Sequence, residues 1–192
     1  MRDPPAAPDW PAEDVIRRAK VLFVDHVGTT GILRAARIAR EAAIPVVGDI
    51  EGGAGAEYDE LLQLVDHLIV SWPYAHRLTG CESPSEALRK LWHQGRSVVA
   101  ITCGSEGAWY LDAAAPEEPR QQSPFTVDVV DTTGCGDVFH GAYAAGSAEG
   151  LPLAERVRLA SAAAALKAGR RGGQAGIPTR EAVETFLKER SE

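Results

Sequence analysis

The sequence predicts an α/β protein built on a mostly parallel sheet with antiparallel edge strands, and three observations support this. Short apolar runs of strand length alternate along the chain with amphipathic segments of helix length. The first of these runs, Val21–Asp25, does not alternate between apolar and polar residues, as in a strand that is buried on both faces. The connections are short, so consecutive strands are expected to form right-handed crossovers around the intervening helices. We expect a single domain over residues 1–192, with a flexible lead at 1–10 and a core at 11–192.

The first part of the chain predicts three strands, each following a helical segment. A proline stops the second helix and opens the second strand, and a glycine-rich loop precedes the third helix. The expected elements, in chain order, are helix Pro11–Lys20, strand Val21–Asp25, helix Thr30–Ala43, strand Val46–Ile50, helix Tyr58–Val65 and strand His67–Ser71.

Polar residues stand at the carboxyl ends of these three strands, namely Asp25, Asp49 and Ser71. In parallel sheets this edge holds the ligand crevice. Each of the three can equally close a turn or cap a helix, so the sequence leaves both interpretations open.

The second part of the chain begins with a helix at Pro84–Gln94 and a strand at Ser97–Cys103. A tight glycine turn and a strand at Ala108–Leu111 follow, which indicates a change from parallel to antiparallel pairing. The remaining expected segments are a polar loop at Ala113–Arg120, an extended stretch at Gln121–Val130, a helix after residue 134, an alanine-rich helix at Leu153–Ala168, a glycine-rich loop at Gly169–Gly176 and a helix at Arg180–Lys188.

The composition argues against several classes of protein. The formal net charge is −7, which disfavours nucleic acid and anionic membrane surfaces as partners. No apolar run approaches the roughly 18 residues that a membrane helix needs. The amino terminus has no apolar stretch typical of a signal peptide. The three cysteines are scattered, which indicates reduced thiols and a cytoplasmic location.

The most informative stretch is Asp131-Thr132-Thr133-Gly134-Cys135-Gly136-Asp137, followed by Val138-Phe139-His140-Gly141-Ala142. Its two glycines predict a turn, and the residues after it have helical periodicity. A glycine turn that leads into a helix leaves backbone N–H groups free at the positive end of the helix dipole, which is an anion site. A carboxylate there can take a proton from a hydroxyl while the N–H groups stabilise a transferred phosphoryl group. Asp137 can equally be a first-turn residue that only complements the dipole.

The stretch resembles the signature of the ribokinase/PfkB family of carbohydrate kinases, in which Ala usually stands where this chain has Cys135. The resemblance implies a ribokinase-like three-layer α/β/α sandwich and ATP-dependent phosphorylation of a sugar hydroxyl. It implies that Asp137 is the catalytic base and that Gly134, Cys135 and Gly136 form the anion hole for the γ-phosphate. ATP, Mg²⁺ and a small sugar are the implied ligands, and the backbone near Asp131 is the candidate site for a monovalent cation.

Other segments resemble the nucleotide site of the same family. Ile101-Thr102-Cys103-Gly104-Ser105-Glu106-Gly107 is similar to its Thr-x-Gly-x-x-Gly turn, and the stretch from Gly172 to Thr179 is similar to the loop that closes around adenine. The residues implied to bind the nucleotide are Thr102, Gly104, Gly107, Thr133, Gly172 and Gly173.

The chain departs from the family pattern in two respects. The family usually carries Asn-x-x-Glu after the third strand, where the Glu helps to place Mg²⁺; here Ser71 and Tyr74 occupy these positions, and both are weaker partners for a hard cation. The family's N-terminal sugar-site and lid portion is also absent from this sequence, so we expect an N-terminally truncated fold with little sugar phosphorylation. An edge or apolar face left by the missing strands would then suit a homodimer. The alternative hypothesis is a degenerate nucleotide-binding or interaction module.

Three further groups of residues carry open interpretations. His140 lies three residues after Asp137 on the same helical face, where it either tunes the base or is a hydrogen-bonded structural residue. Arg170 and Arg171 either contact phosphate or are solvated. The four tryptophans, Trp10, Trp72, Trp92 and Trp109, are expected to be packing residues.

Overall fold

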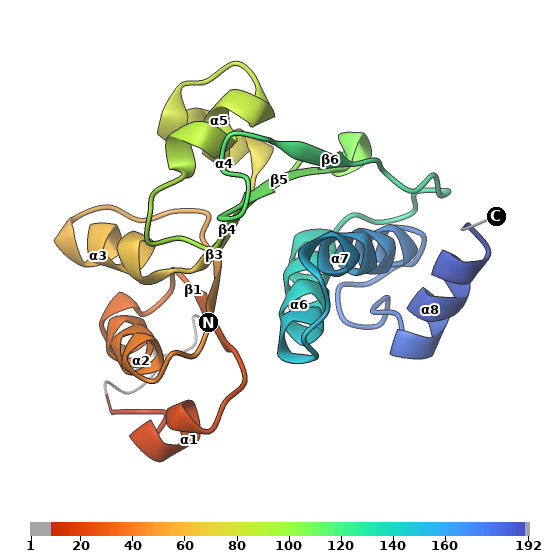
Figure 1. Ribbon diagram of the computed structural model, residues 1–192. Coiled ribbons are helices and arrows are strands. Elements are labelled where there is room, and N and C mark those ends of the chain that lie inside the picture. Colours follow the sequence, from red (N-terminus) through yellow and green to blue (C-terminus); the bar gives the residue numbers. More distant parts are fainter. Residues whose placement is uncertain (1–8, 191–192) are drawn as a thin grey trace. The chain divides into compact units, whose positions relative to one another are not determined.

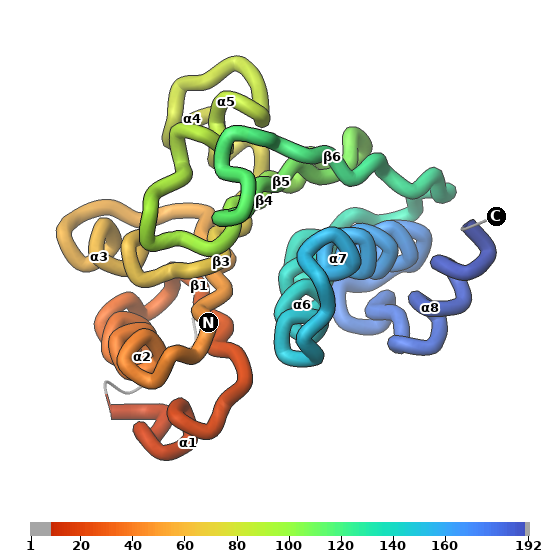
Figure 2. Tube along the Cα trace, in the orientation of Figure 1, coloured from red at the N-terminus to blue at the C-terminus, as the bar shows by residue number. Residues whose placement is uncertain are grey.

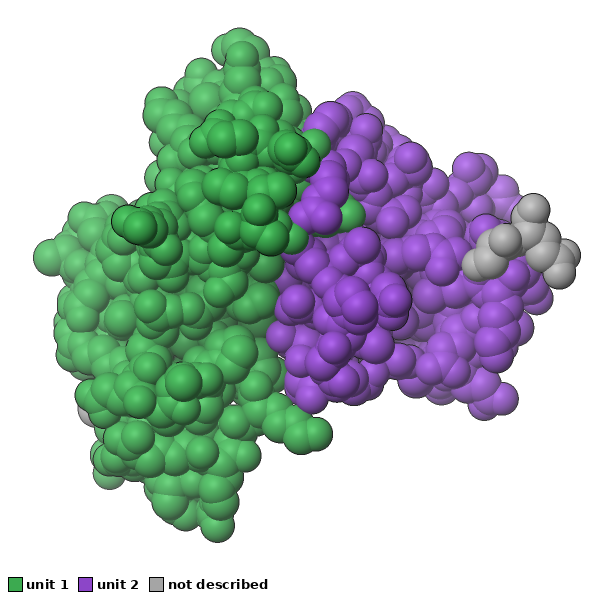
Figure 3. All heavy atoms as spheres, viewed as in Figure 1, with its two compact units in different colours: residues 1–101, 110–119 green, residues 102–109, 120–192 purple. Residues whose placement is uncertain are grey.

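The computed structural model describes residues 9–190, and the chain divides into two compact units (Figure 3). Unit 1 comprises the residues up to 101 together with 110–119, and unit 2 comprises 102–109 and the residues from 120 onward. The single domain expected over the whole chain stays a prediction. Most of the expected lead at 1–10 lies outside the described residues.

The strands form one mixed six-stranded sheet in the order β1-β2-β3-β4-β5-β6, which confirms the predicted α/β class. The first two pairings are parallel, with Leu22 beside Val46 and Val47 beside His67. Cys103 N–H donates to the Gly107 carbonyl at 2.8 Å, closing the predicted tight turn. The strands are β1 (Leu22–Asp25), β2 (Val46–Asp49), β3 (His67–Ser71), β4 (Val98–Thr102), β5 (Ala108–Asp112) and β6 (Arg120–Gln122).

The prediction that the first strand is buried on both faces is wrong. In β1 only Val24 is buried, and the Phe23 side chain is 45% exposed. β1 stands at one end of the strand order. An apolar run shows that a residue tolerates burial, but burial also requires a layer of structure to cover each face.

The helices of unit 1 follow the strands as the sequence predicts, with boundaries that shift by a few residues (Figure 1). Their apolar sides and the strands β2, β3 and β4 supply fully buried residues such as Leu61, Leu68 and Leu88. The helices are α1 (Glu13–Arg17), α2 (Thr29–Glu41), α3 (Ala56–Leu64), α4 (Trp72–Thr79) and α5 (Pro84–Leu91).

Helix α4 was not predicted, although the sequence carries its start and stop signals. Ser71 is the N-cap, and its Oγ accepts a hydrogen bond from the Tyr74 N–H at 3.4 Å. Pro73 lies in the first turn, where its missing N–H costs nothing. Gly80 ends the helix with φ at +67°.

Unit 2 contains a short 3-10 helix at Gly104–Glu106, strand β6, and the helices α6 (Cys135–Ala148), α7 (Leu153–Ala168) and α8 (Arg180–Lys188). The chain trace shows α6 beside α7 (Figure 2), and α7 also packs against α8. Thr179 caps α8 as predicted, since its Oγ1 accepts from the Ala182 N–H at 3.2 Å.

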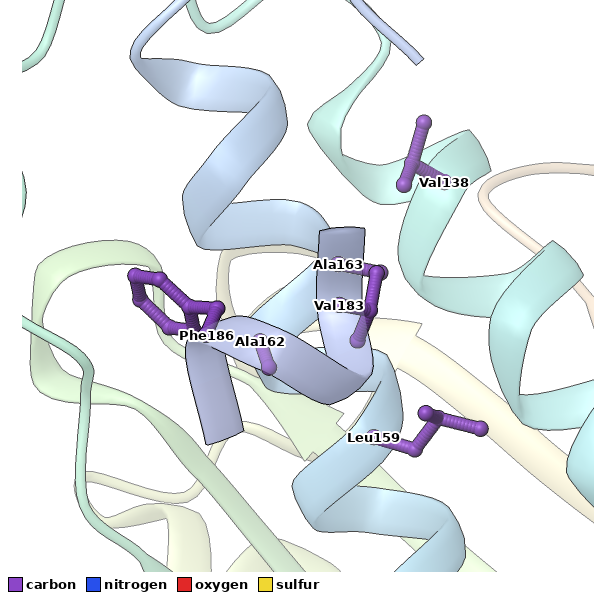
Figure 4. Packing of buried hydrophobic residues seen from close by; sticks show 6 residues of the cluster. All are labelled: Val138, Leu159, Ala162, Ala163, Val183 and Phe186. Carbon is purple, nitrogen blue, oxygen red and sulfur yellow. The ribbon is translucent and has the colours of Figure 1, made fainter. Parts of the chain in front are cut away.

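One apolar cluster holds these three helices together (Figure 4). The alanines of α7 allow close approach, and the Phe125 and Phe186 rings meet edge to face with centroids 5.3 Å apart. The cluster therefore fixes the start of α6 relative to α8. Its buried members are Val138, Leu159, Ala162, Ala163, Val183 and Phe186.

The tryptophan prediction is wrong for Trp10, whose side chain is 63% exposed, whereas the other three tryptophans are half-buried. The three cysteines are free thiols. Across residues 9–190, no helix combines the length and apolar character needed to cross a bilayer.

Candidate functional site

The start of α6 has the geometry that the sequence predicts. Gly134 is the N-cap, with φ at +78°, and Cys135 N–H donates to the Thr132 carbonyl at 3.1 Å. The first bond within the helix runs from Val138 N–H to the Gly134 carbonyl at 2.9 Å. The N–H groups of Gly136 and Asp137 precede that bond, so they remain available to an anion.

The surroundings of this turn leave room for a ligand. A Cβ placed on Gly136 would meet no heavy atom within 4 Å, and the Asp137 side chain is exposed. A Cβ on Gly134 would lie 3.6 Å from Asp137 Oδ2 and 3.7 Å from Gly173 Cα. The turn therefore brings the carboxylate and the glycine-rich loop to the same place.

Asp131 joins that turn to the glycine-rich loop. Its Oδ1 accepts the Thr133 N–H at 2.9 Å, and its Oδ2 accepts the Gly172 N–H at 2.8 Å. The hydrogen bond from the Thr133 N–H, followed in size of effect by the one from Gly172, lowers the pKa of Asp131 to about 2. The carboxylate is therefore charged at neutral pH and occupied by backbone donors.

Lys167, near the end of α7, lies beneath the same two segments. Its side chain is fully buried, and Nζ donates to the carbonyl oxygens of Asp131 at 3.0 Å and Arg170 at 3.3 Å. Nothing in the sequence distinguished this lysine from an ordinary last-turn cation.

A cavity of about 630 Å³ opens beside the start of α6, and its walls all belong to unit 2. Asp137 and the turn provide its polar end, and apolar side chains of α6, α7 and α8 provide much of the rest. The lining residues are Thr133, Gly134, Asp137, Val138, Gly141, Ala142, Ala145, Glu149, Leu159, Ala163, Gly173, Gln174, Ile177, Pro178, Arg180 and Val183.

The structure brings most of the predicted site residues together. Thr133, Gly134, Asp137 and Gly173 line the cavity, Cys135 and Gly136 continue the same turn, and Gly172 binds Asp131. The predicted residues Thr102, Gly104 and Gly107 lie in unit 2 but do not line this cavity.

A close backbone contact accounts for Gly107, one of the two glycines among these residues. A Cβ on Gly107 would lie 2.1 Å from the Gln122 carbonyl oxygen, and its φ is +87°. The close approach of β6, to which Gln122 belongs, and the positive φ thus require glycine here. Its expected role toward a nucleotide stays a prediction.

Sequence reasoning missed the rim of the cavity. Arg180 Nη1 and Glu149 Oε2 form an ion pair at 2.9 Å, joining the first turn of α8 to the end of α6. The two residues are 31 positions apart, and no local pattern signals that they meet.

His140 proves to be a hydrogen-bonded structural residue. Its side chain is buried, and Nδ1 lies 2.8 Å from the Gly136 carbonyl oxygen, to which it donates. The bond ties the second turn of α6 to the peptide that forms the anion site.

Ser71 and Tyr74 both have structural partners in unit 1. The Glu51 carboxylate accepts the Ser71 N–H at 2.6 Å and the Ser71 Oγ–H at 2.7 Å. The Tyr74 hydroxyl is paired with the Tyr58 hydroxyl, and burial raises the pKa of Tyr74. Among the described residues, no three His, Cys, Asp or Glu side chains cluster in a way that could hold a metal ion.

Comparison with known proteins identifies the family. The chain matches the pfkB family carbohydrate kinases over residues 7–180. It is 32% identical over 183 residues to a ribokinase of Arabidopsis thaliana, covering 91% of this chain and 48% of that protein. It is also 32% identical to a ribokinase of Haemophilus influenzae, covering 83% of this chain and 52% of the other.

Solved structures agree with this match. The structure of Arabidopsis thaliana ribokinase complexed with ribose and ATP superposes with a TM-score of 0.82 and 31% identity, covering 92% of this chain and 58% of that one. A ribokinase of Thermotoga maritima gives a TM-score of 0.82 and 27% identity, covering 95% and 61%. The chain therefore belongs to the pfkB carbohydrate kinase family and has a ribokinase fold. It spans about half the length of the curated relatives that it matches.

Proposed function

We propose that this chain supplies the nucleotide and phosphoryl-transfer part of an ATP-dependent sugar kinase. The observation that carries the proposal is the start of α6, where the N–H groups of Gly136 and Asp137 precede the first helical hydrogen bond at the mouth of a cavity of about 630 Å³. Phosphoryl transfer depends mainly on positioning and on stabilisation of charge, and both are features of this turn.

The residues present fit ATP. The open space above Gly136 admits phosphate oxygens to the free N–H groups of Gly136 and Asp137, and Gly134 and Cys135, the other proposed members of the anion hole, belong to the same turn. The apolar part of the cavity, including Ile177 and Pro178, suits a flat heteroaromatic base. Thr133 would approach the phosphates from the turn itself, and Gly172 and Gly173 would do so from the glycine-rich loop. Thr102, Gly104 and Gly107 remain proposed nucleotide contacts.

Asp137 is the proposed catalytic base. It is exposed, it lines the cavity, and it stands in the same turn as the anion site. There it would accept the proton of an acceptor hydroxyl as that oxygen attacks the γ-phosphorus. A small sugar is the proposed acceptor, and a cytoplasmic location and a homodimer stay predictions.

The side chains described here do not provide a site for Mg²⁺. Ser71 caps a helix and its hydroxyl donates to Glu51, while the Tyr74 hydroxyl is paired with another tyrosine, so both side chains already have structural partners. If Mg²⁺ takes part, phosphate oxygens and water would supply most of its ligands.

Calorimetric titration with ATP tests the proposal. Gly136→Glu places a carboxylate over the phosphate site, so we expect affinity to fall by about tenfold or more. Gly95→Glu adds the same charge to an exposed glycine of unit 1 and should leave affinity unchanged. Equal affinity of the two variants, or no ATP binding by the unmodified chain, would refute the proposed site.

A second measurement separates binding from turnover. Asp137→Asn removes the base but keeps the side-chain shape, so ATP affinity should be retained while the rate of phosphorylation of a sugar panel falls about 10²–10⁴-fold. The structural roles of Ser71 and Tyr74 favour one alternative, a nucleotide-binding module without turnover. ATP binding with no phosphorylated product from any sugar, with or without Mg²⁺, would support that alternative.

A further inference from the structure

We propose that the ammonium group of Lys167 takes the place of a monovalent cation at this site, so that the chain needs no added K⁺ to order its nucleotide loops. The inference rests on the proposed function for its relevance to ATP. Its structural basis is independent, because every contact that follows lies within unit 2.

The positions of two backbone oxygens carry the argument. The carbonyl oxygens of Asp131 and Arg170 come from different segments, and both accept a hydrogen bond from Lys167 Nζ, at 3.0 and 3.3 Å. Backbone carbonyls that converge from two loops are typical ligands of a hard cation. Here the positive charge that they surround belongs to the protein itself.

The lysine is held in this place by packing. Its side chain has no exposed surface. A Cβ on Gly176 would lie 2.8 Å from Lys167 Cδ and 3.0 Å from Cε. The glycine thus leaves room for the lysine stem to pass beneath the loop.

The surroundings compensate the buried charge. Lys167 lies in the last turn of α7, where the helix dipole favours a cation. The Asp131 carboxylate belongs to the same residue as one of the carbonyl ligands, and the lysine charge is one of the influences that lower its pKa. A buried ammonium with dipole and carbonyl partners is tolerated, whereas an isolated one is not.

The consequence is a link between the two segments that line the proposed phosphate site. Asp131 begins the turn that leads into α6, and Arg170 lies in the loop whose Gly172 N–H binds the Asp131 carboxylate. A monovalent cation expected near Asp131 would have to displace the ammonium group. The residues present therefore do not fit that cation, and the lysine replaces it.

Thermal unfolding in different salts tests this inference without ATP. At equal ionic strength, the unmodified chain should have the same Tm in potassium, ammonium and tetramethylammonium chloride. A Tm that is higher in potassium chloride than in tetramethylammonium chloride would overturn the inference. This comparison of salts needs no variant, so it remains decisive if substitutions at Lys167 prevent folding.

Variants test the exchange directly. Lys167→Ala opens the cation position, so Tm should fall in tetramethylammonium and recover in potassium or ammonium chloride. Lys167→Met fills the same path without charge and should not recover. Lys188→Ala, at an exposed lysine of α8, serves as the control and should show no dependence on the cation. A Lys167→Ala variant that lacks any cation-specific recovery would contradict the proposal.

Calorimetry links the result to the nucleotide. ATP affinity of the unmodified chain should change less than about twofold between the salts, while that of Lys167→Ala should depend on potassium or ammonium. Absence of ATP binding in every salt would refute the proposed function, and the thermal unfolding measurements would then decide the cation inference. A potassium dependence in the unmodified chain would refute the inference alone.

Discussion

His140 Nδ1 donates to the carbonyl oxygen of Gly136 across 2.8 Å, so a buried side chain of α6 is anchored on the peptide that offers the proposed anion site. This contact explains why an imidazole can stand near the proposed base without facing the cavity. Its contribution is to position the first turn of the helix.

His140→Ala should therefore destabilise the protein by about 1–3 kcal/mol, because it leaves a buried cavity and removes a hydrogen bond. His140→Asn should be less destabilising than His140→Ala, since its amide can still donate to a carbonyl. Urea unfolding measures both. His76→Ala is the matched control, because His76 makes a similar bond to the Cys81 carbonyl but is exposed. Equal losses for the two alanine variants would contradict the positioning role.

Asp131 predicts a dependence of stability on pH. Its pKa of about 2 in the folded chain lies below the ordinary value of 3.8. A carboxyl group with a depressed folded pKa stabilises the fold above about pH 4, and this contribution is lost as the pH falls toward about 2. Asp131→Asn should thus unfold at lower urea concentration at pH 7, and the difference from the unmodified chain should disappear between about pH 4 and 2. Asp128→Asn, at an exposed carboxylate of the same unit, is the control and should lower the urea midpoint less. A difference in urea midpoint between Asp131→Asn and the unmodified chain that persists at about pH 2 would exclude this explanation.

The two glycines of the turn should respond oppositely to alanine. Gly134 has φ at +78°, so Gly134→Ala should cost about 1–2 kcal/mol of stability. Gly136 is helical with open space around it, so Gly136→Ala should stabilise the helix by about 0.5–1 kcal/mol. The added methyl group would nevertheless stand over the free N–H groups and weaken ATP binding. Thermal unfolding and calorimetry measure the two effects, and a loss of stability in both variants would disprove the assigned backbone conformations.

Gly176→Ala tests the packing of the lysine stem. The new methyl carbon would meet Lys167 Cδ at 2.8 Å and the Gly172 carbonyl oxygen at 2.9 Å. Overpacking of this kind costs about 1–3 kcal/mol, which should appear as a lower Tm. Gly95→Ala, at an exposed glycine, provides the comparison. An unchanged Tm for Gly176→Ala would mean that the lysine moves without cost.

Local pattern predicted the start of α6 well, because glycine spacing and helical periodicity act over a few residues. The Asp131–Gly172 hydrogen bond could not be predicted in this way, since it joins residues 41 positions apart. Lys167 was missed for a similar reason: an alanine-rich helix with a terminal lysine indicates an exposed cation, and only the loop above it makes the lysine buried.

The errors elsewhere also have physical causes. Phe23 belongs to an apolar strand, but the strand stands at the end of the sheet order and one face stays open. Ser71 and Pro73 are the capping signals of α4, and these local signals fix the helix although the chain departs from the family pattern at the same positions. Arg96 is a buried cation that no local pattern signals, and its guanidinium donates to the carbonyls of Val65 and Leu91.

The side-chain anchors of the turn and loop all bind main-chain atoms: Asp131 receives peptide N–H groups, and Lys167 and His140 donate to peptide oxygens. Every amino acid supplies the same carbonyl, and every one except proline supplies the same N–H. Substitution of the Arg170 side chain would therefore leave the hydrogen bond from Lys167 to its carbonyl in place. Arg171 and Gln174 take part in none of these anchoring hydrogen bonds. The outer surface of the loop is thus a permissive region, in which charge can be altered without removing the bonds that shape the site beneath it.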